Sequence, residues 1–332
     1  MEHVLIVGTA TWGTTLGLIL AKHGTPVWLL ARTEKEMLEL QKDRENKRFL
    51  PSFVFPSLLQ ITNCPETSIP SAKAIIFAVP SRSMRENANY LSQWISGKTL
   101  IISASKGLEF SEGKRMSEVL QETLPESAAQ RIAVLSGPNL AKEIAADHPS
   151  SAVIASHNQD TCIQAQALLS TPSFRIYTNK DVLGTELGGS LKNVIAIAAG
   201  ICDGLGYGDN AKAALLTRGL AEIANLGIRM GAKATTFAGL SGMGDLIATC
   251  SSRLSRNHYL GIQLAQGFSL EHIIQEMDNV AEGAHTTAAT LALARQYDIE
   301  MPITEATYAI LSGHLTAQEG AAKLMTRFLK PE

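Results

Sequence analysis

Residues 4–20 have the sequence VLIVGTATWGTTLGLIL, in which an apolar run leads into a glycine turn and then into a helical pattern. A strand, a tight turn and a helix in this order begin a dinucleotide-binding unit. The turn GTATWG, residues 8–13, matches the fingerprint G-x-G-x-x-G at Gly8 and Gly13, but Ala10 replaces the middle glycine. The motif is weak by itself, because an ordinary β-α corner can have the same residues.

Ala10 adds a methyl group where the fingerprint brings bare backbone close to a pyrophosphate. We expect a negative φ at Ala10, because the methyl group then need not collide with the ligand. The free N–H groups at the helix N-terminus stay available for an anion. The place of the turn at the start of a β-α-β unit favours a cofactor site.

The composition is that of an ordinary globular protein, with 332 residues, 45% hydrophobic and 18% charged residues, and a net charge of −2. This charge gives no electrostatic reason to expect nucleic acid or an anionic membrane surface as a partner. The longest weakly charged stretch, Leu187–Cys202, contains Lys192 and falls short of the ~18 apolar residues that a membrane span needs, so no stable membrane insertion is expected.

The four cysteines lie far apart, without a C-x-x-C motif or a cluster with histidine. Neither a disulfide framework nor a metal site is therefore expected. The N-terminus has no basic segment followed by a cleavage site, and with reduced thiols this indicates a cytoplasmic protein.

The first half of the chain alternates strand and helix patterns, which predicts a doubly wound, mostly parallel α/β Rossmann domain over residues 1–182. Short runs rich in valine and isoleucine indicate strands that are buried on both faces. The expected strands are Val4–Gly8, Val27–Ala31, Ala74–Val79, Thr99–Ser103, Ile132–Ser136 and Ser151–Ala155. Helical patterns then follow one another after Asp181, and they predict an all-α domain over residues 183–332.

Arg32 and Glu34 follow the predicted second strand. An acidic residue near this point accepts hydrogen bonds from the ribose hydroxyls of NAD, whereas an arginine can pair with the 2′-phosphate of NADP. Arg32 therefore favours NADP, and Glu34 keeps NAD possible. The structural alternative is a solvated surface arginine.

Lys192 is the only charged side chain between Glu186 and Asp203, and its neighbours have the apolar spacing of a largely buried helix. A lysine that loses solvation there is suited to proton transfer. The alternative is a lysine that extends along the helix and places its ammonium group in water.

The segment SGMGDLIATCSSRLSRN, residues 241–257, is dense in glycine, hydroxyl and charged residues and lies between predicted helices. Ser255 is a plausible N-cap. Arg256 and Asn257 would then lie at a helix N-terminus, which suits a small phosphate. The alternative is a polar loop with a capping serine.

Together these residues resemble the bacterial type of NAD(P)H-dependent glycerol-3-phosphate dehydrogenase along the whole chain. The motifs that carry the resemblance are the turn from Gly8 to Trp12-Gly13, AVPS at 78–81, SASKGLE at 103–109, SGPNLAKEIA at 136–145, ELGGSLKNVIAIAAGICDGLGYGDNAKAALLTRG at 186–219, GLSGMGDLIATCSSRLSRN at 239–257 and VAEGAHT at 280–286. Several of these motifs are long and specific.

The resemblance implies reversible hydride transfer between NADPH, or NADH, and dihydroxyacetone phosphate, which gives sn-glycerol 3-phosphate for glycerophospholipid synthesis. It further implies a cleft site between the two domains and a homodimer. The implied catalytic residues are Lys192, the proton acceptor, with Lys106 and Asp245. The implied coenzyme contacts are Gly8, Thr11, Trp12, Gly13, Arg32, Lys106, Ala141, Arg256, Val280 and Glu282. The implied substrate contacts are Lys106, Gly137, Asn139, Lys192, Asp245, Ser255, Arg256 and Asn257.

Two other functions stay open at this point. A related β-hydroxyacid or phosphogluconate-type dehydrogenase would share the two-domain plan but lack the run 241–257. A non-catalytic nucleotide sensor would bind NADPH without a proton donor, and the presence of both Lys106 and Lys192 argues against it.

Overall fold

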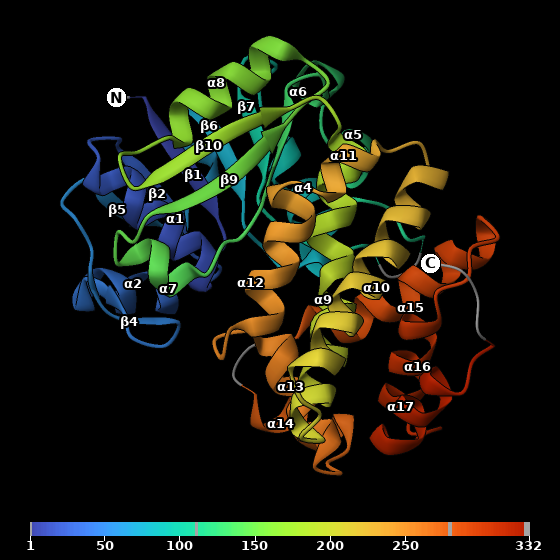
Figure 1. Cartoon of the computed structure of the whole chain (residues 1–332). Helices are drawn as coiled ribbons and strands as arrows, with labels where there is room; N and C mark the ends of the chain where they lie inside the picture. The colour runs from blue at the N-terminus through green and yellow to red at the C-terminus, as the bar shows by residue number, and fades with distance from the viewer. Residues whose placement is uncertain (1, 110–111, 278–280, 329–332) are drawn as a thin grey trace. The chain divides into compact units, whose positions relative to one another are not determined.

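A computed structural model describes residues 2–109, 112–277 and 281–328, and it contains two compact units (Figure 1). The first unit comprises Met1–Lys106 and Lys114–Thr185, and the second comprises Gly107–Gly113 and Glu186–Glu332. The expected boundary after residue 182 lies close to this division. The short segment Gly107–Gly113, which the sequence places in the first domain, is grouped with the second unit.

The first unit is built on an eight-stranded sheet with the order β10-β9-β8-β7-β6-β1-β2-β5. Neighbouring strands are parallel except for the antiparallel pair β8 and β9, which confirms the predicted mostly parallel α/β class. The strands are β1 (His3–Val7), β2 (Val27–Leu30), β5 (Leu59–Thr62), β6 (Ala72–Phe77), β7 (Leu100–Ser103), β8 (Ile132–Ser136), β9 (Ser150–Ala155) and β10 (Phe174–Asn179), and a separate hairpin pairs β3 (Glu45–Asn46) with β4 (Leu50–Val54).

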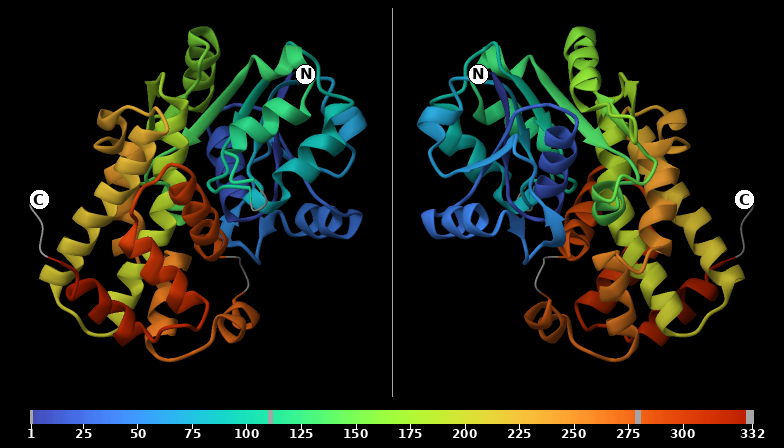
Figure 2. Two further views of the ribbon diagram at one scale, coloured as in Figure 1. Left: turned by 90° about the vertical axis from the view of Figure 1, so that its right-hand side faces the viewer. Right: turned by 90° about the vertical axis from the view of Figure 1, so that its left-hand side faces the viewer.

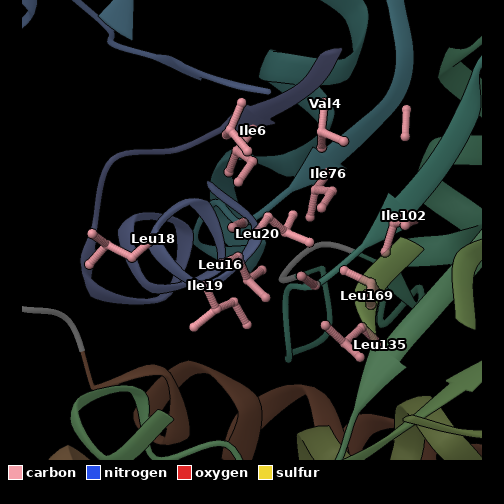
Figure 3. Close-up of a cluster of buried hydrophobic side chains, with 14 of the residues drawn as sticks. Val4, Ile6, Leu16, Leu18, Ile19, Leu20, Ile76, Ile102, Leu135 and Leu169 are labelled. Atoms are coloured by element: carbon pink, nitrogen blue, oxygen red, sulfur yellow. The ribbon is translucent and has the colours of Figure 1, made fainter. Parts of the chain in front are cut away.

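Helices cover both faces of this sheet, because successive residues of a buried strand point to opposite sides. Val4 and Ile6 pack with Leu16 and Leu20 of α1 on one face (Figure 3), and Leu5 belongs to the core on the other face. The helices of the unit are α1 (Thr11–Lys22), α2 (Glu34–Asp43), α3 (Pro65–Ser68), α4 (Met84–Ser92) after a 3-10 turn (Ser81–Ser83), α5 (Met116–Thr123), α6 (Glu126–Ala129), α7 (Ala141–Ala145) and α8 (Gln159–Leu169).

The hairpin and both edge strands of the sheet, β5 and β10, were not predicted from the sequence. β10 alternates buried and exposed residues along Phe174–Tyr177, and an edge strand of this kind lacks the continuous apolar run by which the inner strands were predicted. The first strand matches the prediction closely, since β1 ends one residue before Gly8, and α1 begins at Thr11, three residues before the start expected from the helical pattern at Thr14.

The second unit consists of helices (Figure 2), which confirms the predicted all-α class. Its longest helix, α9, is buried along almost its whole length. The helix α12 was not predicted. It is short, and the glycines before it and the serines after it are typical of a loop. The helices are α9 (Val182–Gly204), α10 (Asp209–Arg229), α11 (Ala234–Phe237), a π-helical turn (Leu240–Gly244), α12 (Asp245–Ser251), α13 (Arg256–Ala265), α14 (Leu270–Glu276), α15 (Glu282–Gln296), α16 (Pro302–Leu311) and α17 (Ala317–Met325).

Within the described ranges, the structure has no helix that combines the length and the apolar character of a membrane span.

A buried carboxylate joins α10 to the first turn of α16. Glu222 accepts hydrogen bonds from the backbone N–H groups of Ile303 (2.7 Å) and Thr304 (3.2 Å) and from the Thr304 hydroxyl (3.1 Å). These bonds satisfy donors at a helix N-terminus that have no partner within the helix. Burial nevertheless raises the pKa of Glu222 from its ordinary value of 4.5 to about 7.

The raised pKa of Glu222 predicts a loss of stability as the pH increases. The folded pKa lies above the unfolded one, so the contribution of the protonated group is complete below about pH 4.5 and is lost as the pH rises through about 7. The loss amounts to at most about 3 kcal/mol. We expect the melting midpoint of Glu222→Gln, relative to that of the wild type, to rise by a few degrees from pH 5 to pH 8. A midpoint difference that is constant with pH, as expected for the exposed control Glu271→Gln, would contradict this account.

Candidate functional site

The glycine turn between β1 and α1 has no room for side chains at its two fingerprint glycines. Gly8 has a φ of +113°, and a Cβ atom there would lie 2.6 Å from the carbonyl oxygen of Ala78. A Cβ atom at Gly13 would lie 2.0 Å from the carbonyl oxygen of Gly8. The turn therefore exposes backbone at the start of α1, as a phosphate-binding turn requires.

Ala10 has a φ of −67° and a ψ of 177°, which confirms the expected negative φ. It is the N-cap of α1, and it provides no side-chain hydrogen bond to the first turn of the helix. The N–H groups of that turn point away from the helix, where an anion can accept from them. Thr11 begins the helix, and its hydroxyl donates to the carbonyl oxygen of Phe49 (3.1 Å).

Asn46 holds the turn in place, and the sequence analysis missed it. Its Nδ2 atom donates to the carbonyl oxygen of Thr9 (2.7 Å) and to the Thr14 hydroxyl (2.9 Å). The Thr14 hydroxyl itself donates to the same carbonyl oxygen (2.9 Å). The side chains of Asn46 and Thr14 are buried, so water does not compete for these hydrogen bonds, which stabilise the turn.

Several buried polar atoms near this end of the sheet lack a hydrogen-bond partner among the described residues. Among them are Nε1 of Trp12 and both amide atoms of Asn139, which follows β8. Buried polar groups normally have partners, and those without one often belong to binding sites. Trp12 packs edge-on against Phe174 of β10, with ring centroids 6.5 Å apart. These unsatisfied atoms and the open glycine turn fit a polar ligand such as a dinucleotide.

The remaining predicted residues of the first unit follow the carboxyl ends of its strands. Lys106 follows β7, and its Nζ atom donates to the carbonyl oxygen of Gly137 after β8 (2.7 Å). Ala141 begins α7. Arg32 follows β2 and is exposed. Ligands of doubly wound sheets bind at this edge, so the structure gathers these residues where a site is expected.

Lys192 is buried in the second unit, 6% exposed, and it does not extend to water. Its ammonium group donates to Oδ1 of Asp245, which is 1% exposed, and to the hydroxyl of Thr249 (2.5 Å). Asp245 and Thr249 lie one turn apart on α12, so both face the same point of α9. The structure brings together two predicted residues that are 53 positions apart, and it adds Thr249, which the sequence analysis missed.

A π-helical turn, Leu240–Gly244, leads directly into Asp245. α9 lies close against this turn at Gly188, where a Cβ atom would lie 2.5 Å from the carbonyl oxygen of Ser241. Gly188 precedes Lys192 by one helical turn, so this contact fixes the distance between the two members of the ion pair. Single π-turns are rare in proteins as a whole, and those that occur are frequently found at functional sites.

The N-terminus of α13 forms the second cluster of predicted residues in this unit. The hydroxyl of Ser255 accepts a hydrogen bond from the backbone N–H of His258 (3.3 Å), which confirms Ser255 as the N-cap. Oδ1 of Asn257 accepts from the backbone N–H of Gly283 (3.0 Å), which ties the start of α15 to this helix. Desolvation lowers the pKa of Arg256, and the charge of Glu282 offsets part of that shift. Val280 lies outside the described residues.

A buried histidine anchors α13 behind these residues. Nε2 of His258 and Nζ of Lys212 both contact Oδ2 of Asp203, at 2.7 Å and 2.6 Å. Burial raises the pKa of Asp203, but these two hydrogen bonds outweigh burial and bring the pKa below its ordinary value. No local sequence pattern predicts this cluster, because its members come from three different helices.

Comparison with known proteins assigns the chain to a family. The model of the NAD-dependent glycerol-3-phosphate dehydrogenase N-terminus matches residues 3–162, and that of the C-terminus of the same dehydrogenase matches residues 181–322. The chain belongs to this dehydrogenase family.

Relatives within the glycerol-3-phosphate dehydrogenase family match along almost the whole chain. A glycerol-3-phosphate dehydrogenase [NAD(P)+] of Dehalococcoides mccartyi is 48% identical over 98% of this chain and 91% of its own length. One from Chlorobium phaeobacteroides is 44% identical over 99% of both chains. The crystal structure of glycerol-3-phosphate dehydrogenase from Coxiella burnetii superposes with a TM-score of 0.93 at 36% identity, over 98% of this chain and 99% of the other.

Ala10 provides a direct test of the glycine turn in this dehydrogenase. Since its φ is negative, the methyl group imposes no backbone strain, and we expect Ala10→Gly to bind NADPH within about tenfold of the wild type, or ~1.4 kcal/mol. The matched control is Gly8→Ala, which places a methyl group against Ala78 and should weaken binding far more. NADPH titration by fluorescence measures both. A gain larger than tenfold in Ala10→Gly would show that the methyl group obstructs the site.

Proposed function

We propose that this chain reversibly reduces dihydroxyacetone phosphate to sn-glycerol 3-phosphate, with NADPH or NADH as hydride donor, and so supplies glycerophospholipid synthesis. Family membership over both halves of the chain supports the reaction. The observation that carries the proposal is the buried contact of Lys192 with Asp245 and Thr249, which gives a proton donor with a fixed position.

The residues of the glycine turn fit a nicotinamide dinucleotide. The turn and the start of α1 would hold the pyrophosphate, and the buried Nε1 of Trp12 is available to an acceptor on the ligand. When bound, the coenzyme supplies the hydride. The proposed coenzyme contacts are Gly8, Thr11, Trp12, Gly13, Arg32, Lys106 and Ala141 in the first unit and Arg256, Val280 and Glu282 in the second.

The substrate contacts are proposed in two groups. Lys106, Gly137 and Asn139 follow β7 and β8, and both amide atoms of Asn139 are available for substrate hydroxyl groups. Lys192, Asp245, Ser255, Arg256 and Asn257 belong to the second unit. Arg256 and the Nδ2 atom of Asn257 at the start of α13 would bind the phosphate, because a helix N-terminus and a guanidinium group both favour an anion.

Lys192 transfers the proton in this proposal. In the reduction, its Nζ atom gives a proton to the C2 oxygen of dihydroxyacetone phosphate, and in the reverse reaction it removes that proton from the C2 hydroxyl. Asp245 and Thr249 hold the ammonium group in one position, so no reorientation is needed during the reaction. Lys106 stabilises negative charge on the oxygen, an effect that can contribute roughly 3–4 kcal/mol.

The proposal also covers the roles of the two domains, the cellular location and the oligomeric state. The first domain, residues 1–182, binds the coenzyme, and the second, residues 183–332, carries the proton donor. The enzyme works in the cytoplasm, which the four free cysteines support. It forms a homodimer, as expected from the resemblance to the family.

The test is NADPH oxidation in the presence of dihydroxyacetone phosphate. We expect turnover by the wild type and a loss of at least about 10³-fold in kcat for Lys192→Ala, with NADPH binding retained, because the proton donor is removed and the coenzyme contacts are not. The matched control is Lys323→Ala on α17, an exposed lysine of the same unit, which should keep full activity.

Two results would contradict this proposal. The first is an absence of turnover by folded wild-type protein that binds NADPH, as a nucleotide sensor would behave. The second is substantial activity of Lys192→Ala, which would remove this lysine from the proton transfer.

A further inference from the structure

The side chain of Glu36 on α2 bridges two loops at the carboxyl edge of the sheet. Oε1 accepts a hydrogen bond from the hydroxyl of Thr9, which lies inside the glycine turn. Oε2 accepts from the backbone N–H of Arg32, which follows β2 (2.9 Å). The carboxylate therefore lies between the end of β1 and the end of β2, and the side chain is half-buried there.

Helix capping alone does not explain this position. Thr33 is the N-cap of α2, and its hydroxyl accepts from the backbone N–H of Glu36 (3.2 Å), which is half of a capping box. The glutamate of a complete box would bond back to the N–H of the N-cap residue. Here the carboxylate bonds one residue further back, at Arg32, and reaches Thr9, which is 27 positions away.

The two partners of Glu36 mark the place where the adenosine ribose of a dinucleotide binds. In doubly wound folds the pyrophosphate lies at the first glycine turn, and the ribose lies beside the end of the second strand. Thr9 belongs to the first of these places and Arg32 to the second. A carboxylate has about four acceptor positions, so after bonding to Thr9 and Arg32 it can still accept from ribose hydroxyls.

We propose that Glu36 determines coenzyme specificity together with Arg32. Its carboxylate accepts a hydrogen bond from the 2′-hydroxyl of NAD and repels the 2′-phosphate of NADP, whereas the guanidinium group of Arg32 attracts that phosphate. The opposed charges balance the use of the two coenzymes. This inference rests on the proposed function for the class of coenzyme. It also replaces Glu34, the acidic residue that kept NAD possible in the sequence, with one whose carboxylate reaches the turn.

The test compares the affinities for NADP⁺ and NAD⁺, and for 2′,5′-adenosine bisphosphate and 5′-AMP, by titration calorimetry. Glu36→Gln removes the charge and keeps the hydrogen bonds, since the amide oxygen can accept from Arg32 and the amide nitrogen can donate to the Thr9 hydroxyl. We expect the affinity ratio of NADP⁺ to NAD⁺ to rise about tenfold, with the same shift between the two fragments. Arg32→Asp should shift the ratio in the opposite direction.

Glu39→Gln is the matched control, because Glu39 lies on the same helix, is exposed and pairs with Lys35. It should leave the ratio unchanged. An unchanged ratio in Glu36→Gln, or an equal loss of affinity for both coenzymes, would show that Glu36 only stabilises the loops and would overturn the inference. Wild-type protein that binds neither coenzyme would instead overturn the proposed function, so the two failures are distinguishable.

Discussion

The buried ion pair between Lys192 and Asp245 is the constraint on which the candidate site residues of the second unit depend. A charge removed from water is costly unless it is paired and hydrogen-bonded, so neither residue is suited to its position without the other. The hydroxyl of Thr249 adds a second acceptor for the same ammonium group. The pair thus imposes one arrangement of α9 against α12, and the packing around it must allow that arrangement.

The close contact between α9 and the π-helical turn is part of this packing. Gly188 lets the backbone of Ser241 approach where a side chain would not fit, and Asp245 begins the next helix directly after the turn. A hydrogen bond from the backbone N–H of Gly283 to Asn257 holds the start of α13, where the phosphate contacts are proposed. The proposed proton donor and the proposed phosphate contacts thus belong to the same helical unit. In the first unit, Asn46 and Glu36 constrain the glycine turn in a comparable way.

The sequence predicted the elements whose pattern is local. Inner strands such as β8 show as short apolar runs, and the N-cap Ser255 shows by its position before a helical pattern. Edge strands such as β10 escaped prediction because half of their residues face solvent. The apolar neighbours of Lys192 left open whether its ammonium group is buried or reaches water, and the structure shows that it is buried. Its partner could not be predicted, because no local pattern links two residues that are 53 positions apart. The same reason hid the contact of Glu36 with Thr9. The roles of individual site residues come from the resemblance to the family and stay predictions.

The most direct test of this account is a double-mutant cycle on kcat for dihydroxyacetone phosphate reduction, with Lys192→Ala, Asp245→Asn and the double variant. If Asp245 acts by holding the ammonium group of Lys192, the two residues form one unit, and the double variant should lose no more activity than Lys192→Ala alone. Losses in the two single variants that multiply in the double variant would show that the residues act independently, and would contradict the account.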